Sequence, residues 1–210
     1  MRTSWRYSIA VATVVLATAC SRMLPPQPDL SRFFVLTAMD PPTADPSPTS
    51  DGVRPLALAV GPVRLAPYLD RNDLAIRLSA DEIRYSDGER WAEPLERNVT
   101  NVLALNLARL VGNARVFAYP QPPVLLQPAY QIDVEIGRLD TTRAGEATLA
   151  AHWTIEDLGT RNVLASRDAY LTRAATGTGT PAAVAALSGV LAELSQEIAS
   201  TVRDLPRKTA

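Results

Sequence analysis

Alternation between apolar and polar or small residues predicts strands in the first half of the chain. Residues 56–60 and 74–78 place leucine, isoleucine or valine at every second position, which is typical of strands buried mainly on one face. Residues 83–86 predict a third, shorter strand. We expect Pro62 to end the first of these and Asp87-Gly88, a strong turn dipeptide, to end the third.

One earlier strand is expected at residues 31–39, with Phe33 and Phe34 as core residues. The next segment, residues 40–55, is too rich in proline to fold, so we expect a surface loop there. It is either an inert connection or a partner-binding loop. Residues 120–128 hold four prolines and predict a second loop.

Three runs of alternating residues follow that second loop, at 130–137, 147–155 and 163–172. Short polar links join them. Consecutive strands joined in this way predict an antiparallel meander.

Two segments have the period of a helix instead of a strand. Residues 91–111 step their apolar positions by three or four, with Pro94 tolerated in the first turn. Residues 180–202 form a longer apolar stripe that begins at Thr180-Pro181, and it must pack on the sheet or on another subunit.

The chain is therefore expected to be a single domain of the α/β (α+β) class. We predict a mixed, mostly antiparallel sheet with two long amphipathic helices packed on it. Both helices are expected on one face of the sheet, with opposite faces as the alternative.

The first residues have the pattern of an export signal. Arg2 and Arg6 precede an apolar run at 9–17, and Thr18-Ala19 supply the small residues that a signal peptidase requires. The run is about half the ~20 residues of a bilayer-spanning helix, which argues against a permanent anchor. We expect residues 1–19 to be a signal peptide that is removed.

Cys20 is the only cysteine, so an exported chain cannot use it for an internal disulfide. Residues 16–20 resemble the bacterial lipobox, in which the cysteine becomes the lipidated first residue. Ser21 resembles the residue found there in lipoproteins of the outer membrane. This predicts a lipidated tether at 20–30, a folded domain at 31–205 and a C-terminal tail at 206–210.

Composition and chemistry restrict the possible functions. A formal net charge of -1 leaves no excess of basic residues that would favour binding to nucleic acid. His152 is the only histidine, expected on the surface opposite Trp153, so no zinc site or other metal or cofactor site is predicted. The acidic residues between Asp70 and Glu82 are expected to be turn and surface residues, and we do not expect an enzyme.

Residues 67–71 predict a recognition corner, because Pro67 fixes a turn that presents a tyrosine and a leucine beside opposite charges. The alternative is that the two apolar side chains close the end of the sheet. The candidate partner-binding residues of this corner are Tyr68, Leu69, Asp70 and Arg71.

Several of these segments together resemble the ABC-type transport auxiliary lipoproteins, the PqiC-like or YmbA-like group. They are the lipobox at Cys20, FFVL at 33–36, VGPVRLAPYLDR at 60–71, IRLS at 76–79 and RWAEPL at 90–95. Asn72-Asp73 stand where many relatives have proline and glutamine. The resemblance implies an anchored periplasmic partner of an MCE protein and its ABC transporter, which move lipids between the two membranes and maintain membrane integrity. It provides no catalytic residues.

Under this resemblance, the corner at 67–71 and residues 91–95 are candidate contacts with the MCE protein or with another copy of the chain in a ring. Trp91 and Leu95 are the candidate partner-binding residues of the second segment. Two other roles remain open from the residues themselves. The protein could be an outer-membrane lipoprotein that activates a periplasmic cell-wall enzyme, or a lipid-carrying periplasmic domain with its own cavity.

Overall fold

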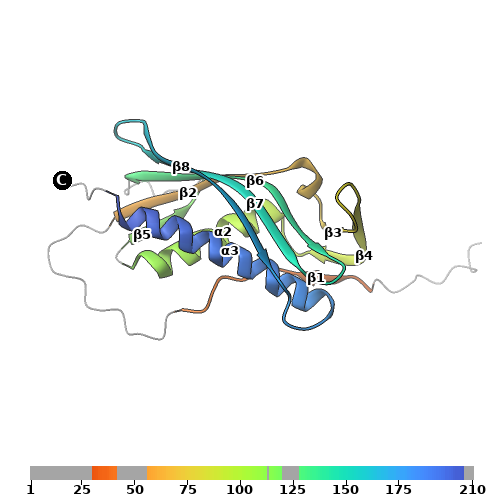
Figure 1. Ribbon diagram of the computed structural model, residues 1–210. Helices are drawn as coiled ribbons and strands as arrows, with labels where there is room; N and C mark the ends of the chain where they lie inside the picture. The colour runs from red at the N-terminus through yellow and green to blue at the C-terminus, as the bar shows by residue number, and fades with distance from the viewer. Residues whose placement is uncertain (1–29, 42–55, 113, 120–127, 206–210) are drawn as a thin grey trace, which may run out of the picture. The chain divides into compact units, whose positions relative to one another are not determined.

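In the described part of the chain, the computed structural model has eight strands, one short 3-10 helix and two long helices (Figure 1). The structure describes residues 30–41, 56–112, 114–119 and 128–205. The chain divides into two units, and the fold below is that of the second, which starts at Arg32. Its elements are β1 (Arg32–Phe34), β2 (Leu56–Leu65), η1 (Pro67–Leu69), β3 (Asp73–Arg77), β4 (Ile83–Trp91), α2 (Leu95–Val111), β5 (Ala114–Ala118), β6 (Tyr130–Thr142), β7 (Ala147–Asp157), β8 (Asn162–Arg173) and α3 (Gly179–Arg203).

The sheet is forked, and β6 is the strand from which it divides. Along one edge β6 pairs with β7, which pairs with β8, both antiparallel. Along the other edge its first half pairs in parallel with β2, and β5 lies beyond β2. The last two residues of β6, Thr141 and Thr142, pair instead with β3, which leads to β4 and β1. The sheet therefore has two branches on one side of β6.

This architecture confirms the predicted mixed sheet with two helices. The meander of β6, β7 and β8 is confirmed, and its two pairings are the longest in the sheet. Antiparallel pairs thus include most of the paired residues, although β1, β2 and β5 pair only in parallel.

Two strands continue past their predicted ends, because each contains a bulge at the residue expected to stop it. β2 runs through Pro62, where the register with β6 shifts between Val60 and Val63, so the missing N–H of the proline is not needed in the ladder. β4 runs through Gly88, whose φ of +81° serves an irregularity of the strand and not a hairpin turn. Gly and Pro therefore mark bulges here.

The helices α2 and α3 lie side by side on one face of the sheet (Figure 1). α2 packs on β2 and β5, whereas α3 packs on β7 and β8. The apolar stripe predicted for α3 is buried along its whole length: Val184, Leu187, Leu191, Leu194, Ile198 and Val202. Among the described residues, α3 alone is long and apolar enough to cross a membrane, but here its stripe forms the core of the domain. Each fully buried leucine or isoleucine contributes about 1.5–3 kcal/mol to folding.

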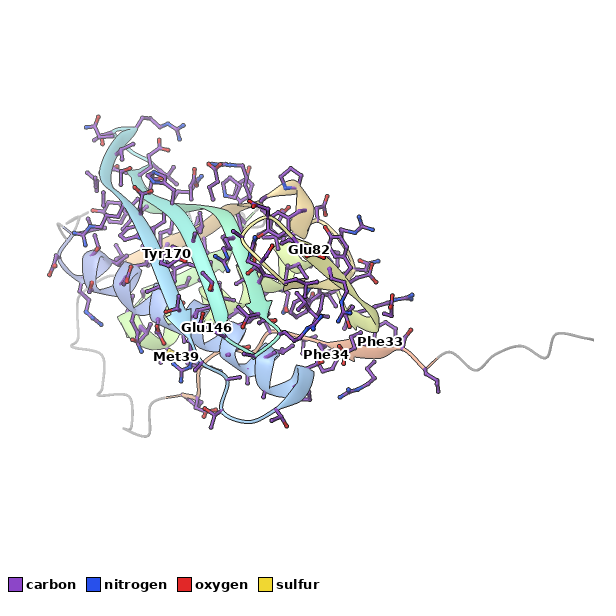
Figure 2. The ribbon with its side chains drawn as sticks, turned by 45° about the vertical axis from the view of Figure 1, so that its right-hand side comes forward. Phe33, Phe34, Met39, Glu82, Glu146 and Tyr170 are labelled. Atoms are coloured by element: carbon purple, nitrogen blue, oxygen red, sulfur yellow. The ribbon has the colours of Figure 1, made fainter. Side chains whose placement is uncertain are left out.

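The segment after β1 does not continue as a strand, and its core residue is not the predicted one. β1 ends at Phe34, and Phe33 is 62% exposed and points away from the body (Figure 2). Phe34 packs against the core only in part, whereas Leu36 is 3% exposed. The prediction that Phe33 is a core residue is therefore wrong, because the chain turns toward the helices two residues later.

Side-chain amides of α2 form hydrogen bonds with the backbone of this segment, as a neighbouring strand would. Asn98 accepts a hydrogen bond from the Leu36 N–H at 2.6 Å and donates one to the Leu36 carbonyl at 3.3 Å. Two turns further along α2, Asn106 accepts from the Met39 N–H at 2.8 Å. Both asparagines are buried, so these bonds satisfy groups that would otherwise be costly to bury.

The same segment also links α2 to α3. The Thr37 N–H donates to Ser188 Oγ of α3 at 3.0 Å. Asn106 Nδ2 donates to Ser195 Oγ at 3.1 Å, a direct bond between the two helices in the core. Residues 36–39 thus fix the position of both helices relative to each other. We call residues 36–39 the clamp segment.

We expect Asn98→Ala to lower the free energy of unfolding by about 2 kcal/mol, because it leaves the buried N–H and carbonyl of Leu36 without partners. Asn101→Ala, an exposed position on the same helix, is the matched control and should change stability little. Urea denaturation followed by circular dichroism measures both. Equal stability of the two variants would show that the clamp segment does not depend on Asn98.

Candidate functional site

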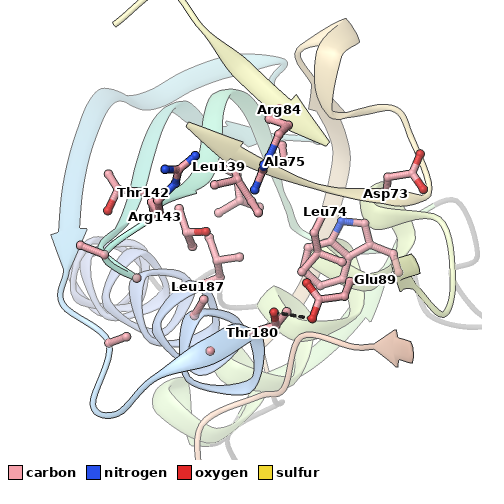
Figure 3. A pocket seen from close by; sticks show the side chains of 18 of the residues that line it. Asp73, Leu74, Ala75, Arg84, Glu89, Leu139, Thr142, Arg143, Thr180 and Leu187 are labelled. Atoms are coloured by element: carbon pink, nitrogen blue, oxygen red, sulfur yellow. Dashed lines mark hydrogen bonds between the residues drawn. The ribbon is translucent and has the colours of Figure 1, made fainter. Parts of the chain in front are cut away.

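A cavity of about 360 Å³ opens at the point where the sheet divides. Its walls come from β3 and β4 of one branch, from the end of β6 and the turn after it, and from residues 175–180 with the first turns of α3. Segments far apart in the sequence thus meet around one space (Figure 3).

The inner wall of the cavity is apolar. Leu74 of β3, Leu139 of β6 and Leu187 of α3 approach it from three sides (Figure 3). Trp91 and Leu95, at the end of β4 and the start of α2, also line it. All five side chains are buried, so the cavity is an extension of the hydrophobic core that reaches the surface.

Glu89 lies at the edge of this cavity and is held from three directions. It accepts hydrogen bonds from Thr180 Oγ1 at 2.6 Å and from Ser86 Oγ at 2.7 Å, and it pairs with Arg32 at 3.3 Å. Burial alone would raise the pKa of Glu89, but the hydroxyl hydrogen bonds and the arginine outweigh it and the pKa lies below its ordinary value. Glu89 therefore joins β1, β4 and the start of α3 as an ionised carboxylate.

Two arginines at the cavity have no such partner. Arg84 of β4 and Arg143 of the turn after β6 are both exposed, and neither forms an ion pair with a described residue. The remaining acid in the lining, Asp73, pairs with Arg90 at 3.6 Å. The mouth of the cavity thus carries an excess of positive charge.

A buried carboxylate organises the corner at 67–71. Asp140 of β6 has a fully buried side chain, and one of its oxygens accepts hydrogen bonds from Arg77 at 2.8 and 3.0 Å and from the Tyr68 hydroxyl at 3.1 Å. The other oxygen accepts from Arg138 at 3.0 Å. Burial and the charge of Asp140 raise the pKa of Tyr68, and the hydrogen bond to Asp140 raises the pKa of Arg77. We call Asp140, Arg77, Arg138 and Tyr68 the Asp140 network.

The predicted contact residues divide into two groups. Tyr68 is half-buried, whereas Asp70 and Arg71 are exposed, with the Arg71 guanidinium 4.3 Å from the ring centre of Tyr85. Leu69, Trp91 and Leu95 are 3%, 7% and 4% exposed and line the cavity. Because their side chains are buried, these three are core and cavity residues in this fold and do not form part of the outer surface. Cys20, the predicted lipidation site, lies outside the described residues.

The sequence did not indicate the role of Asp140 or the position of the cavity. Alternation ended at Gly137, where β6 contains a bulge between Ile136 and Arg138, so the strand was expected to stop there. Arg77 alternates with the apolar positions of residues 74–78, which places it on the face expected to be solvated, and the pattern of a single strand does not show what folds over that face. The one signal in the sequence is Asp140, the acid of the RLD sequence at 138–140. It could have suggested a buried partner for a nearby arginine.

His152 joins a hydrogen-bonded row on the exposed face of β7 and β8. Its Nδ1 lies 2.7 Å from Asp168 Oδ1, and its Nε2 lies 3.1 Å from Ser166 Oγ. The order matches that of a Ser-His-Asp triad, but the Asp168 side chain is 91% exposed, so water competes for the charge that a buried triad aspartate supplies. The described residues hold no group of three or more candidate metal ligands.

We expect Asp140→Asn to destabilise the protein by about 3 kcal/mol, because it leaves two largely buried guanidinium groups without their carboxylate. Asp133→Asn, on the same strand but with a neutral amide partner, is the control. Chemical denaturation at neutral pH measures both variants. A loss no larger than that of the control would mean that the arginines find other partners.

The Glu89 carboxylate should stabilise the fold in a pH-dependent way. Because its pKa is lowered in the folded state, its contribution is present above the unfolded value of 4.5 and is lost as the pH falls through the folded pKa. The difference in unfolding free energy between the wild type and Glu89→Gln should therefore shrink as the pH falls below 4.5. Urea titrations at several pH values test this, with the exposed Glu82→Gln as control. A difference that is constant with pH would contradict it.

Comparisons with known proteins bear on the same region of the chain. The family model of ABC-type transport auxiliary lipoprotein components matches residues 34–199. The comparison with curated proteins finds no match.

Among solved structures, protein XCC0632 from Xanthomonas campestris is similar, with 19% identity, a TM-score of 0.64, and coverage of 82% of this chain and 94% of that one. An uncharacterised protein has 18% identity and a TM-score of 0.65, with coverage of 82% and 98%. The PelC dodecamer from Paraburkholderia phytofirmans is more distant, with 17% identity, a TM-score of 0.42, and coverage of 73% and 91%. The first two show the fold.

The family model matches nearly the whole folded unit and confirms the resemblance found in the sequence. The chain belongs to the family of ABC-type transport auxiliary lipoprotein components.

Proposed function

We propose that this protein is a lipid-anchored auxiliary component of an ABC transport system that moves lipids across the cell envelope, with an MCE-type periplasmic protein as its partner. Family membership over residues 34–199 is the observation that carries this proposal. The cysteine after the apolar N-terminal run supports the anchor, because acyl chains on Cys20 would hold the domain at a membrane without any lipid-facing residue in the fold. The proposed location is the periplasmic face of the outer membrane.

The proposed role is that of a binding and scaffold protein and not of an enzyme. The described side chains closest to a catalytic arrangement are those around His152, and these are open to water on a flat sheet face. A triad needs a preorganised and largely water-excluded environment to stabilise the charge that develops during acyl transfer.

The corner at 67–71 is the proposed contact surface. Pro67–Leu69 forms the 3-10 helix η1, and the Tyr68 hydroxyl donates a hydrogen bond to Asp140. Tyr85 donates a hydrogen bond to the Tyr68 carbonyl at 3.1 Å, so the turn is held from both sides. A rigid turn presents Asp70 and Arg71 at low entropic cost, which favours specific recognition. A second copy of the chain in a ring is the other occupant that this surface suits.

Affinity purification of the lipidated protein from cross-linked native membranes, with mass spectrometry of the partners, tests this proposal. We expect an MCE protein and ABC transporter subunits to co-purify. Arg71→Glu should reduce their recovery about tenfold, because it replaces an attractive charge at a rim contact with a repulsive one.

Arg115→Glu is the matched control, because Arg115 is also exposed and pairs with the start of β2, at the opposite end from η1. Recovery of a cell-wall synthase without transport proteins would support an activator of that enzyme instead. Normal recovery with Arg71→Glu would show that the contact surface lies elsewhere.

A further inference from the structure

We propose that the cavity at the fork of the sheet binds one acyl chain of an anionic amphiphile, and that Arg84 and Arg143 hold its headgroup. The inference deepens the transport role proposed above and rests on it for its biological meaning. The binding itself can be measured whether or not a transport partner is found.

The size and lining of the cavity suit a flexible apolar chain. A volume of about 360 Å³ lies within the range of small-molecule sites. The inner wall is formed by Leu74, Trp91, Leu139 and Leu187, which are all buried. Apart from the indole N–H of Trp91, these side chains offer dispersion contacts and no hydrogen bonds, so this wall favours methylene groups over polar ligands or water.

Two loops of small residues meet at one side of the cavity. The turn after β6 contributes Ala144 and Gly145, and the loop before α3 contributes Ala175 and Gly177. Gly145 has a φ of +85°, and a Cβ there would lie 3.0 Å from the Ala175 Cβ, so a larger side chain at this position would force the two loops apart. The Ala175 N–H also donates a hydrogen bond to the Gly145 carbonyl at 3.2 Å, so the two loops close this side of the cavity.

Charge determines the class of headgroup and the direction of entry. Glu89 and Asp73 are each neutralised by an arginine, whereas Arg84 and Arg143 lack an ion-pair partner among the described residues. Figure 3 shows these two arginines on the side of the cavity opposite Glu89. Planar guanidinium groups bind carboxylate and phosphate oxygens well, and Glu89 repels them. The headgroup is thus placed at Arg84 and Arg143, with the chain toward Leu187.

Photo-cross-linking of the full-length chain in phosphatidylcholine vesicles tests this inference. The probes are palmitic acid with a diazirine at the end of its chain, lysophosphatidylglycerol with the same chain, and palmityl alcohol with the same chain. We expect both anionic probes to label peptides that contain Leu139 or Leu187, about tenfold more than the alcohol does. Preference for one of the two anions distinguishes a carboxylate ligand from a phosphate ligand.

Paired variants separate the two parts of the site. Arg84→Gln combined with Arg143→Gln should lower labelling by the anionic probes about tenfold, to the level of the alcohol. Ala183→Phe should fill the cavity and abolish labelling by all three probes, whereas Ala185→Phe, exposed on the same helix, should not. The unfolding midpoints of all variants are measured in parallel to confirm that they are folded.

Two results would overturn the inference: labelling outside the cavity only, and equal labelling by the alcohol and the acids with no effect of the arginine substitutions. Affinity purification of the Ala183→Phe variant tests separately whether the transport partners are recovered. Failure of the binding site can therefore be told apart from failure of the proposed function. Labelling of the cavity without transport partners would reject the proposed function and leave the binding site in place.

Discussion

The pairing between the Asn98 amide and the backbone of Leu36 is the interaction on which the arrangement of the layers depends. A side-chain amide has one donor and one acceptor group in a plane, so it can replace the edge of a neighbouring strand. By binding Leu36 in this way, α2 fixes the clamp segment, which in turn bonds to α3 through Ser188. Polar contacts thus position the two helices relative to each other, in addition to the packing of their apolar stripes.

The Asp140 network has a comparable role on the other side of β6. A fully buried carboxylate is tolerated only when its charge is matched, and here two arginines and a tyrosine hydroxyl provide the match. Because these groups come from β3, β6 and η1, the carboxylate ties the branch that begins with β3 to the end of β6. β3 and β4 of this branch form one wall of the cavity.

Periodicity in the sequence predicted the elements that are buried on one face. The stripe of α3 and the alternation in β7 each record a single burial direction along a regular element, so both could be identified without a structure. Features that break this regularity could not be identified. Pro62 and Gly88 were read as ends of strands although they lie within bulged strands, and Phe33 was read as a core residue although the chain turns after Phe34.

The candidate site was harder to predict, because its parts are distant in sequence. Leu74, Leu139 and Leu187 each have an ordinary local pattern, and only the fork brings them together. Trp91 and Leu95 were expected at a partner surface because the resemblance to the auxiliary lipoproteins implied a contact at residues 91–95. The same properties suit the interior wall that they form.

The bulge at Gly137 separates β6 into two halves with different tasks. The first half, held in register by β2 and β7, packs under the helices, whereas the second half supplies Leu139 and Thr141 to the cavity. A bulge resets which side chains face each way, so the two halves do not constrain each other's sequence. Asp140 also lies in the second half, so the segment that lines the cavity carries the buried charge on which the branch of β3 and β4 depends, and a change that reshapes the cavity here also acts on stability.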